Sequence, residues 1–285
     1  MNTAQRTPLL KSFRNRLDIA NDQLCFSAFY AYEASQLVSA KAAKQPDSFT
    51  SEVFDRNPFS SRIHRCMNDM ANFQTEFLAQ ASATALHVGV ETLLAYMSAV
   101  RSHSSSLHGG EASSMGNPEE EELLKHLQDV SCILEKELFD TTSYLRRRRN
   151  HLVHMLADPT NEMKRFWNKG ACFVTDFWSK RPAQLFDFDF FSQDLAEFTI
   201  EDGFAIMNIL RIIMSDIDRA IASSLPQDAV LKEVTHRTVD RSKHLLGNHG
   251  RLIRKIRALA VLEYGLDLDE KSYPDSAISV AIEAY

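Results

Sequence analysis

The sequence predicts an all-α protein, and two observations carry this prediction. Glycine and proline, which most often interrupt helices, occur only 9 and 8 times in 285 residues. Between them, apolar residues recur every three to four positions, as on one face of a helix, and do not alternate as in a strand. No internal repeat of the solenoid kind is visible, so we expect the helices to pack as a bundle.

The first 50 residues should form a terminal helical segment, because residues 8–44 carry apolar side chains at helical spacing. These positions are Leu17, Ile19, Leu24, Phe26, Phe29 and Tyr30. The following stretch KQPDSFTSEVFDRNPFSS breaks the pattern, and a second helical region runs from Ser60 to Arg101. The Ser/Gly tract at 102–117 has too little apolar surface to order itself and is expected to be a flexible loop.

The next helix has clear start and stop signals. Asn117 is a good N-cap, Pro118 suits the first helical position, and the four glutamates of 119–122 complement the helix dipole. Asp158-Pro159 should end the helix. Its leucines recur mostly at helical spacing, and a bend is expected at 140–143, where the run DTTS favours caps over helix interiors.

Residues 160–198 form an aromatic-rich insert without helical period, read as a pair of short strands or an irregular packed segment. We expect its rings to serve as core and lid rather than as a base-stacking platform. The helix that follows has capping residues at Thr199 and Glu201-Asp202 and a core-facing apolar stripe. The chain thus divides into a terminal segment (1–50), a helical bundle (60–223) and a basic helical tail (224–285), whose charges are expected to line a solvated face.

Composition restricts the classes of function. A formal net charge of −6 argues against a protein that binds nucleic acid over its whole surface, so any polyanion must meet a local basic patch. The four cysteines lie far apart, which disfavours a disulfide framework and a zinc site. With neither a signal peptide nor a membrane span recognised, we expect a cytoplasmic protein without membrane attachment.

The stretch YLRRRRNHLVHMLA contains the strongest local basic patch. On an ideal helix Arg149 falls in the apolar stripe with Leu145 and Leu152, whereas Arg147 points away. An inward arginine cannot lose its charge, so it must meet an anion. That anion is either a carboxylate, such as Glu91 on the earlier helix, or the phosphate of a ligand.

RRRRNHLVHML resembles the signature of HEPN domains, with Arg149, Asn150 and His154 at the arginine, polar and histidine positions. The resemblance covers about residues 60–223 and implies a HEPN-like α bundle, here with the aromatic insert and extra terminal helices. A loose match of arginine and histidine is weak by itself, because Arg101 with His108 also satisfies the spacing.

The resemblance implies a metal-independent endoribonuclease that cleaves single-stranded RNA by attack of the ribose 2′-hydroxyl, with neither metal nor cofactor. His154 would be the acid/base, Arg149 the charge stabiliser and Asn150 a hydrogen-bonding orienter. Four further residues, Arg146, Arg147, Arg148 and His151, would widen a positive groove for RNA, and Glu91 would support the site.

The resemblance also implies partners. An ideal helix sets Arg149 and His154 roughly 140° apart, and in the family two motif helices face each other across a homodimer. A toxin or anti-phage effector with an antitoxin or regulatory protein would fit, although Leu156 stands where one toxin branch has a modified tyrosine. The alternative is a catalytically inactive helical scaffold that binds nucleic acid, a nucleotide or a partner protein.

Overall fold

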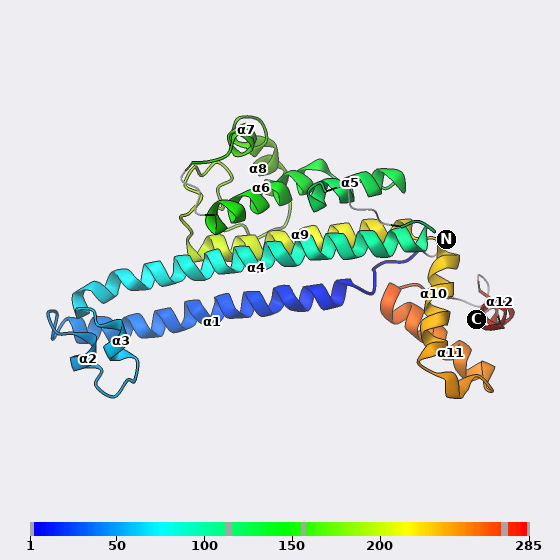
Figure 1. Cartoon of the computed structure of the whole chain (residues 1–285), viewed down its shortest axis with the longest axis horizontal. Helices are drawn as coiled ribbons and strands as arrows, with labels where there is room; N and C mark the ends of the chain where they lie inside the picture. The colour runs from blue at the N-terminus through cyan, green and yellow to red at the C-terminus, as the bar shows by residue number, and fades with distance from the viewer. Residues whose placement is uncertain (1–2, 112–115, 155–157, 269–272, 284–285) are drawn as a thin grey trace. The chain divides into compact units, whose positions relative to one another are not determined.

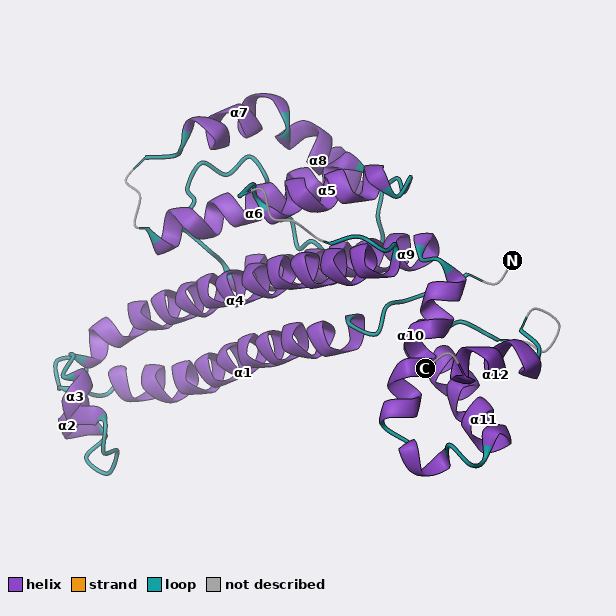
Figure 2. Ribbon diagram, turned by 45° about the vertical axis from the view of Figure 1, so that its right-hand side comes forward, coloured by secondary structure: helices purple, strands orange, loops and turns teal. Residues whose placement is uncertain are grey.

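The computed structural model describes residues 3–111, 116–154, 158–268 and 273–283, and in these ranges the chain forms twelve α-helices and no strand (Figures 1 and 2). The all-α prediction is therefore confirmed. The helices are α1 (Leu10–Ala42), α2 (Thr50–Val53), α3 (Ser60–Ile63), α4 (Met70–Leu107), α5 (Glu119–Asp129), α6 (Lys136–Val153), α7 (Asn161–Lys169), α8 (Ala171–Ser179), α9 (Ile200–Ser224), α10 (Gln227–Asp240), α11 (His249–Leu259) and α12 (Asp275–Glu283).

Two compact units make up the chain, and each is assembled from separate stretches. The first unit consists of Met1–Asn15, Thr92–Phe139 and Arg211–Tyr285, and the second of Arg16–Glu91 and Asp140–Leu210. This division differs from the predicted succession of terminal segment, bundle and tail, because the long helices α1, α4, α6 and α9 each contribute residues to both units.

In the second unit, α1 and α4 lie side by side and run in opposite directions, joined by the short helices α2 and α3 (Figures 1 and 2). Two glycines allow close approach to α9. A Cβ atom on Gly89 would lie 2.5 Å from the side chain of Leu210, and one on Gly203 would lie 2.9 Å from Leu24. Both positions are therefore closed to larger residues without rearrangement of the packing.

The aromatic insert contains helices α7 and α8. A pair of short strands, one of the two forms predicted for this segment, is therefore wrong. Thr160 caps α7 by accepting a hydrogen bond from the backbone N–H of Met163 at 3.3 Å. Trp178 of α8 is buried and donates its indole N–H to Thr141 Oγ1 at 2.9 Å. Both helices are only nine residues long, which is too short for a clear helical period in the sequence.

The predicted bend at 140–143 is also wrong, because the chain breaks earlier. Helix α5 ends at Asp129, Ser131 has a left-handed φ of 56°, and α6 begins at Lys136. Thr141 is accommodated inside α6 because its hydroxyl accepts a hydrogen bond from the Trp178 indole. This contact cannot be predicted from the local sequence, because the two residues are 37 positions apart.

The start of the predicted loop at 102–117 is helical, because α4 continues to Leu107. Ser104 is fully buried there, and its hydroxyl lies 2.9 Å from Nε2 of His126 on α5. Helix α5 starts one residue later than expected, with Pro118 and not Asn117 at the N-cap, and residues 112–115 lie outside the described ranges.

Helix α9 follows its sequence prediction. The backbone N–H of Thr199 donates to Asp202 at 2.9 Å, and that of Asp202 donates to the Thr199 hydroxyl at 3.1 Å, which confirms the predicted cap. The apolar stripe is fully buried, as expected, at Ile206, Ile209, Leu210, Ile213 and Ile217. The prediction that residues 227–259 are helical is confirmed by α10 and α11.

In the first unit, a buried carboxylate joins the amino-terminal segment, α4 and α9 through hydrogen bonds. Asp218 of α9, 1% exposed, accepts hydrogen bonds from the backbone N–H of Thr7 at 3.0 Å and from the Thr7 hydroxyl at 2.6 Å. It also accepts one from the Tyr96 hydroxyl of α4 at 2.7 Å. Burial raises the pKa of Asp218, and the three donors offset part of that rise.

One helix in the described ranges is long and apolar enough to span a membrane by length and composition, over Phe73–Leu107 of α4. Half of the apolar window is buried inside the protein, and core helices of soluble bundles pass the same test.

Candidate functional site

The four arginines of the run lie on α6, and three of them have well-defined partners on different elements. The first of these, Arg147, donates from Nε to the Glu162 carboxylate of α7 at 3.2 Å. Glu162 is 64% exposed, so this ion pair lies at the surface, as the outward phase of Arg147 predicts. Arg146, on the same turn, is half-buried.

Arg148 is buried inside the second unit, with 2% of its surface exposed. Its guanidinium donates to the backbone carbonyls of Glu197 at 2.7 Å and Leu195 at 3.4 Å. It also lies over the ring of Phe198, 4.0 Å from the centroid, and 5.6 Å from that of Phe188. The prediction that Arg148 contributes to an RNA groove is wrong, because the aromatic insert covers this side of α6.

Arg149 faces α4, where its Nη2 forms an ion pair with the carboxylate of Glu91. Its Nη1 donates to the side-chain oxygen of Asn150 at 2.7 Å. The Arg149 side chain is 16% exposed and that of Glu91 is 50% exposed, and burial lowers the pKa of Arg149. The predicted inward arginine is confirmed, and of the two anions considered the carboxylate is present.

His154 lies one residue beyond the end of α6 and is exposed. Its backbone N–H donates to the carbonyl of Asn150 at 3.0 Å, so it continues the last turn of the helix. His151 is half-buried, and its Nδ1 has no hydrogen-bond partner among the described residues. Leu156 lies outside the described ranges.

The three residues of the motif lie within about one and a half turns at the end of α6, but their side chains do not form one contact network. Arg149 contacts both Asn150 and Glu91, whereas no hydrogen bond joins Arg149 to His154 within the described part of the chain. An imidazole and a guanidinium can act on one phosphate only when both reach it. Within one chain this geometry is incomplete.

Two grooves of the second unit lie away from the motif. Two grooves between α1 and α4 have volumes of about 270 and 300 Å³, and neither is lined by a residue of α6. In the ranges that the structure describes, no three or more His, Cys, Asp or Glu side chains are arranged to hold a metal ion.

A second polar cluster, in the first unit, was not anticipated from the sequence. The Tyr264 hydroxyl donates to the Glu233 carboxylate and lies 3.1 Å from His103 Nε2. Arg237 bridges Glu233 at 3.2 Å and Glu263 at 2.8 Å. Burial lowers the pKa of His103 and raises that of Tyr264. The charged groups of this cluster pair with one another, as they do in a structural network.

The partners of Arg147 and Arg148 were not predicted from the sequence. Glu162 pairs with Arg147, and the carbonyls of Leu195 and Glu197 bind Arg148. Backbone carbonyls carry no side-chain signal, and the aromatic density of residues 186–198 is the one feature that marks this segment as a packing partner.

Comparison with protein families, curated proteins and solved structures finds no match to this chain.

Proposed function

We propose that this chain is a HEPN-type, metal-independent endoribonuclease that cleaves single-stranded RNA, acting as a bacterial toxin or anti-phage effector. The observation that supports this most directly is the arrangement at the end of α6. Arg149 is held by Glu91 and Asn150 while part of its side chain stays exposed, and the exposed His154 follows within the next turn.

Each group has a suitable chemical property for such a reaction. Cleavage by the ribose 2′-hydroxyl needs a proton acceptor and a cation that stabilises the charge developing on the phosphate. An imidazole titrates near neutral pH, so His154 would take and return the proton. A guanidinium can bind two non-bridging phosphate oxygens at once, so Arg149 would neutralise the phosphorane while Asn150 fixes its orientation.

A homodimer forms part of this proposal. Since no hydrogen bond joins Arg149 to His154 in the part of one chain that the structure describes, the two groups would meet across a two-fold axis that brings two α6 helices together. Pairing of identical patches is the commonest form of oligomer. Arg146, Arg147 and His151 would then lie beside the shared cleft, whereas the buried Arg148 would support the fold beneath it.

An RNA cleavage assay tests the proposal. The wild type, incubated in EDTA with a panel of single-stranded RNAs, should yield 2′,3′-cyclic phosphate and 5′-hydroxyl ends and leave matched DNA intact. His154→Ala should reduce the rate by about a hundredfold or more, the size expected for loss of an acid/base group. Because His154 is exposed, this substitution should leave the fold unchanged.

Arg147→Ala is the matched control, since it removes a neighbouring cation of the same run without touching Glu91 or Asn150. This variant should retain most of the cleavage activity, and its affinity for RNA should fall mainly at low salt. Equal cleavage by the wild type and His154→Ala, or an absence of cleavage across the panel, would contradict the ribonuclease proposal.

A second candidate function is a catalytically silent helical scaffold that binds nucleic acid, a nucleotide or a protein. Two observations favour it: Arg149 already has a carboxylate partner, and Arg148 is enclosed by the insert. Under this alternative, Arg149→Ala lowers stability but changes no reaction. Inactivity of the wild type, together with a lower melting temperature for Arg149→Ala, would support it.

A further inference from the structure

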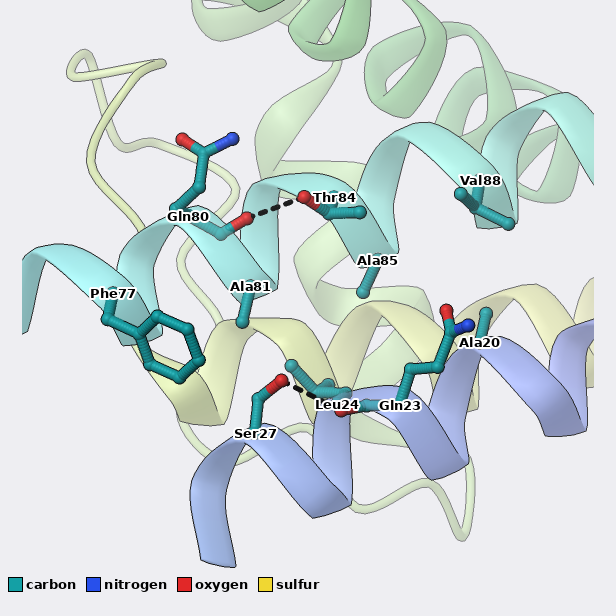
Figure 3. Close-up of a pocket in the computed structure, with 10 residues that line it drawn as sticks. All are labelled: Ala20, Gln23, Leu24, Ser27, Phe77, Gln80, Ala81, Thr84, Ala85 and Val88. Atoms are coloured by element: carbon teal, nitrogen blue, oxygen red, sulfur yellow. Dashed lines mark hydrogen bonds between the residues drawn. The ribbon is translucent and has the colours of Figure 1, made fainter. Parts of the chain in front are cut away.

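Helix α1 carries a second apolar face that the protein itself does not cover. Figure 3 shows the side of α1 next to α4, where Ala20, Leu24 and Ser27 line a groove of about 270 Å³ with small residues of α4. The large apolar residues of α1 are 54–62% exposed, at Ile19, Phe26, Phe29, Tyr30, Tyr32 and Leu37, and Tyr30 also lines the second groove between α1 and α4. Surfaces of this kind on soluble chains mark interaction sites.

Four of these residues form a straight stripe along the helix. At about 100° per residue, Ile19, Phe26, Tyr30 and Leu37 fall within roughly 40° of one another. Spacings of seven and four residues are those of a helix–helix seam, in which one helix packs its side chains between those of another. The stripe thus has the geometry of a contact with a second helix.

The order of the spacings indicates which helix that is. Along the chain the intervals are seven (19 to 26), four (26 to 30) and seven (30 to 37), so the stripe reads the same in both directions. Two identical helices that pair antiparallel about a two-fold axis need this symmetry. Ile19 then lies opposite Leu37 of the partner subunit, and Phe26 lies opposite Tyr30 of the partner subunit.

Charge and area agree with this pairing. The same register sets the exposed Glu33 beside the stripe opposite Gln23 of the partner subunit, which is an amide and not a like charge. The four side chains of the stripe expose on the order of 400 Å² per copy. Flanking polar side chains would bring this near the roughly 800 Å² per partner of a standard stable interface.

We infer that the outer face of α1 is a self-association surface, on which a second copy of this chain packs its own α1 antiparallel about an axis between Phe26 and Tyr30. This interface is independent of the proposed ribonuclease site, because residues 19–37 lie outside the segment that resembles HEPN domains. It would add to any pairing through α6.

Sedimentation equilibrium at micromolar concentrations, with charge-reversal variants, tests the inference. In Phe26→Glu/Tyr30→Glu, antiparallel pairing sets like charges opposite each other, so the mass should fall to half that of the wild type. In Phe26→Glu/Tyr30→Lys, the same register sets Glu opposite Lys, so assembly should be retained; a parallel register would oppose like charges and abolish it. Phe173→Glu/Val261→Glu, at exposed apolar positions on other elements, is the control and should not alter the mass.

Several outcomes would overturn the inference. A wild type that sediments as a monomer would do so, as would an unchanged mass for Phe26→Glu/Tyr30→Glu with its helical circular dichroism intact. Dissociation of both α1 variants would exclude the antiparallel register. A monomeric wild type that floats with phosphatidylglycerol vesicles would assign the stripe to a membrane surface. RNA cleavage by Phe26→Glu/Tyr30→Glu is a separate measurement, because this variant changes neither Arg149 nor His154, whereas a monomeric wild type would also contradict the homodimer of the proposed ribonuclease.

Discussion

Arg148 and Arg149 are adjacent in sequence, yet their guanidinium groups lie in opposite environments. Arg148 is buried among carbonyls and rings of the insert, at Leu195, Glu197 and Phe198. Arg149 points toward α4, where a half-exposed carboxylate neutralises it. The rotation of about 100° between successive helical residues is enough to separate a cation enclosed by the fold from one at the edge of a surface.

The difference shows that a run of like charges on a helix is not one functional unit. Arg147 ties α6 to α7, Arg148 ties it to the segment before α9, and Arg149 ties it to α4. Each arginine thereby connects α6 to a different neighbour in the second unit. Of the three, Arg149 is the one that the proposed ribonuclease reaction uses, so under that proposal its removal should affect cleavage more than stability.

The largest expected effect is on the buried side. Arg148→Ala removes the donor to two backbone carbonyls and opens a cavity against Phe198, so it should lower the free energy of unfolding by about 3 kcal/mol. Chemical denaturation followed by circular dichroism measures this. Arg147→Ala, which breaks only the surface pair with Glu162, should stay within about 0.5 kcal/mol of the wild type. Equal losses for the two variants would refute the contrast between these two neighbours.

A smaller effect is expected on the Arg149 side. Because Glu91 is half-exposed, the ion pair should contribute only about 0.5–1 kcal/mol. A double-mutant cycle with Glu91→Gln and Arg149→Met isolates this coupling energy. It should shrink as salt is raised, since surface charges are screened. A coupling energy above about 3 kcal/mol would show that the Arg149–Glu91 pair stabilises the fold about as strongly as Arg148 does.

The smallest expected effect concerns Tyr144, which contacts Arg148. It is a dependence of the free energy of unfolding on pH in the alkaline range. Burial raises the pKa of Tyr144, whose ring stacks on Phe166 and whose hydroxyl accepts a hydrogen bond from Arg148 at 3.4 Å. Because this pKa is raised, the neutral phenol stabilises the fold below the unfolded value of about 10, and the stabilisation is lost as pH rises through the folded value. Tyr144→Phe should therefore lose stability less steeply than the wild type above pH 10. Parallel curves would contradict a contribution from Tyr144.

The sequence allowed the helical class, the α9 core and the Thr199–Asp202 cap to be predicted, because each depends on residues close together in the chain. It also indicated that Arg149 faces inward, with a carboxylate such as Glu91 as one of the two anions considered. The burial of Arg148 was not predictable from α6 alone. The sequence prediction assumed a single apolar stripe on α6. The insert covers a second face of this helix, so Arg148, at the edge of the stripe, is buried.

The break between α5 and α6 was misplaced for a related reason. DTTS at 140–143 favours a helix end by local preference, but Trp178 supplies a partner for Thr141 and keeps the helix intact. The chain instead ends α5 near Ser131, where no glycine or proline marks the turn. A tertiary contact between residues far apart in sequence thus keeps the helix intact at 140–143.

The hydrogen bonds between Thr7 and Asp218 have a consequence for synthesis of the protein. The two residues are separated by 211 positions, so the amino-terminal segment emerges from the ribosome long before its partner exists. At about 5–20 residues per second, this interval lasts on the order of ten to forty seconds. During that time the first unit cannot close, and a nascent chain truncated before residue 218 would expose Thr7 and Tyr96 without the carboxylate that joins them.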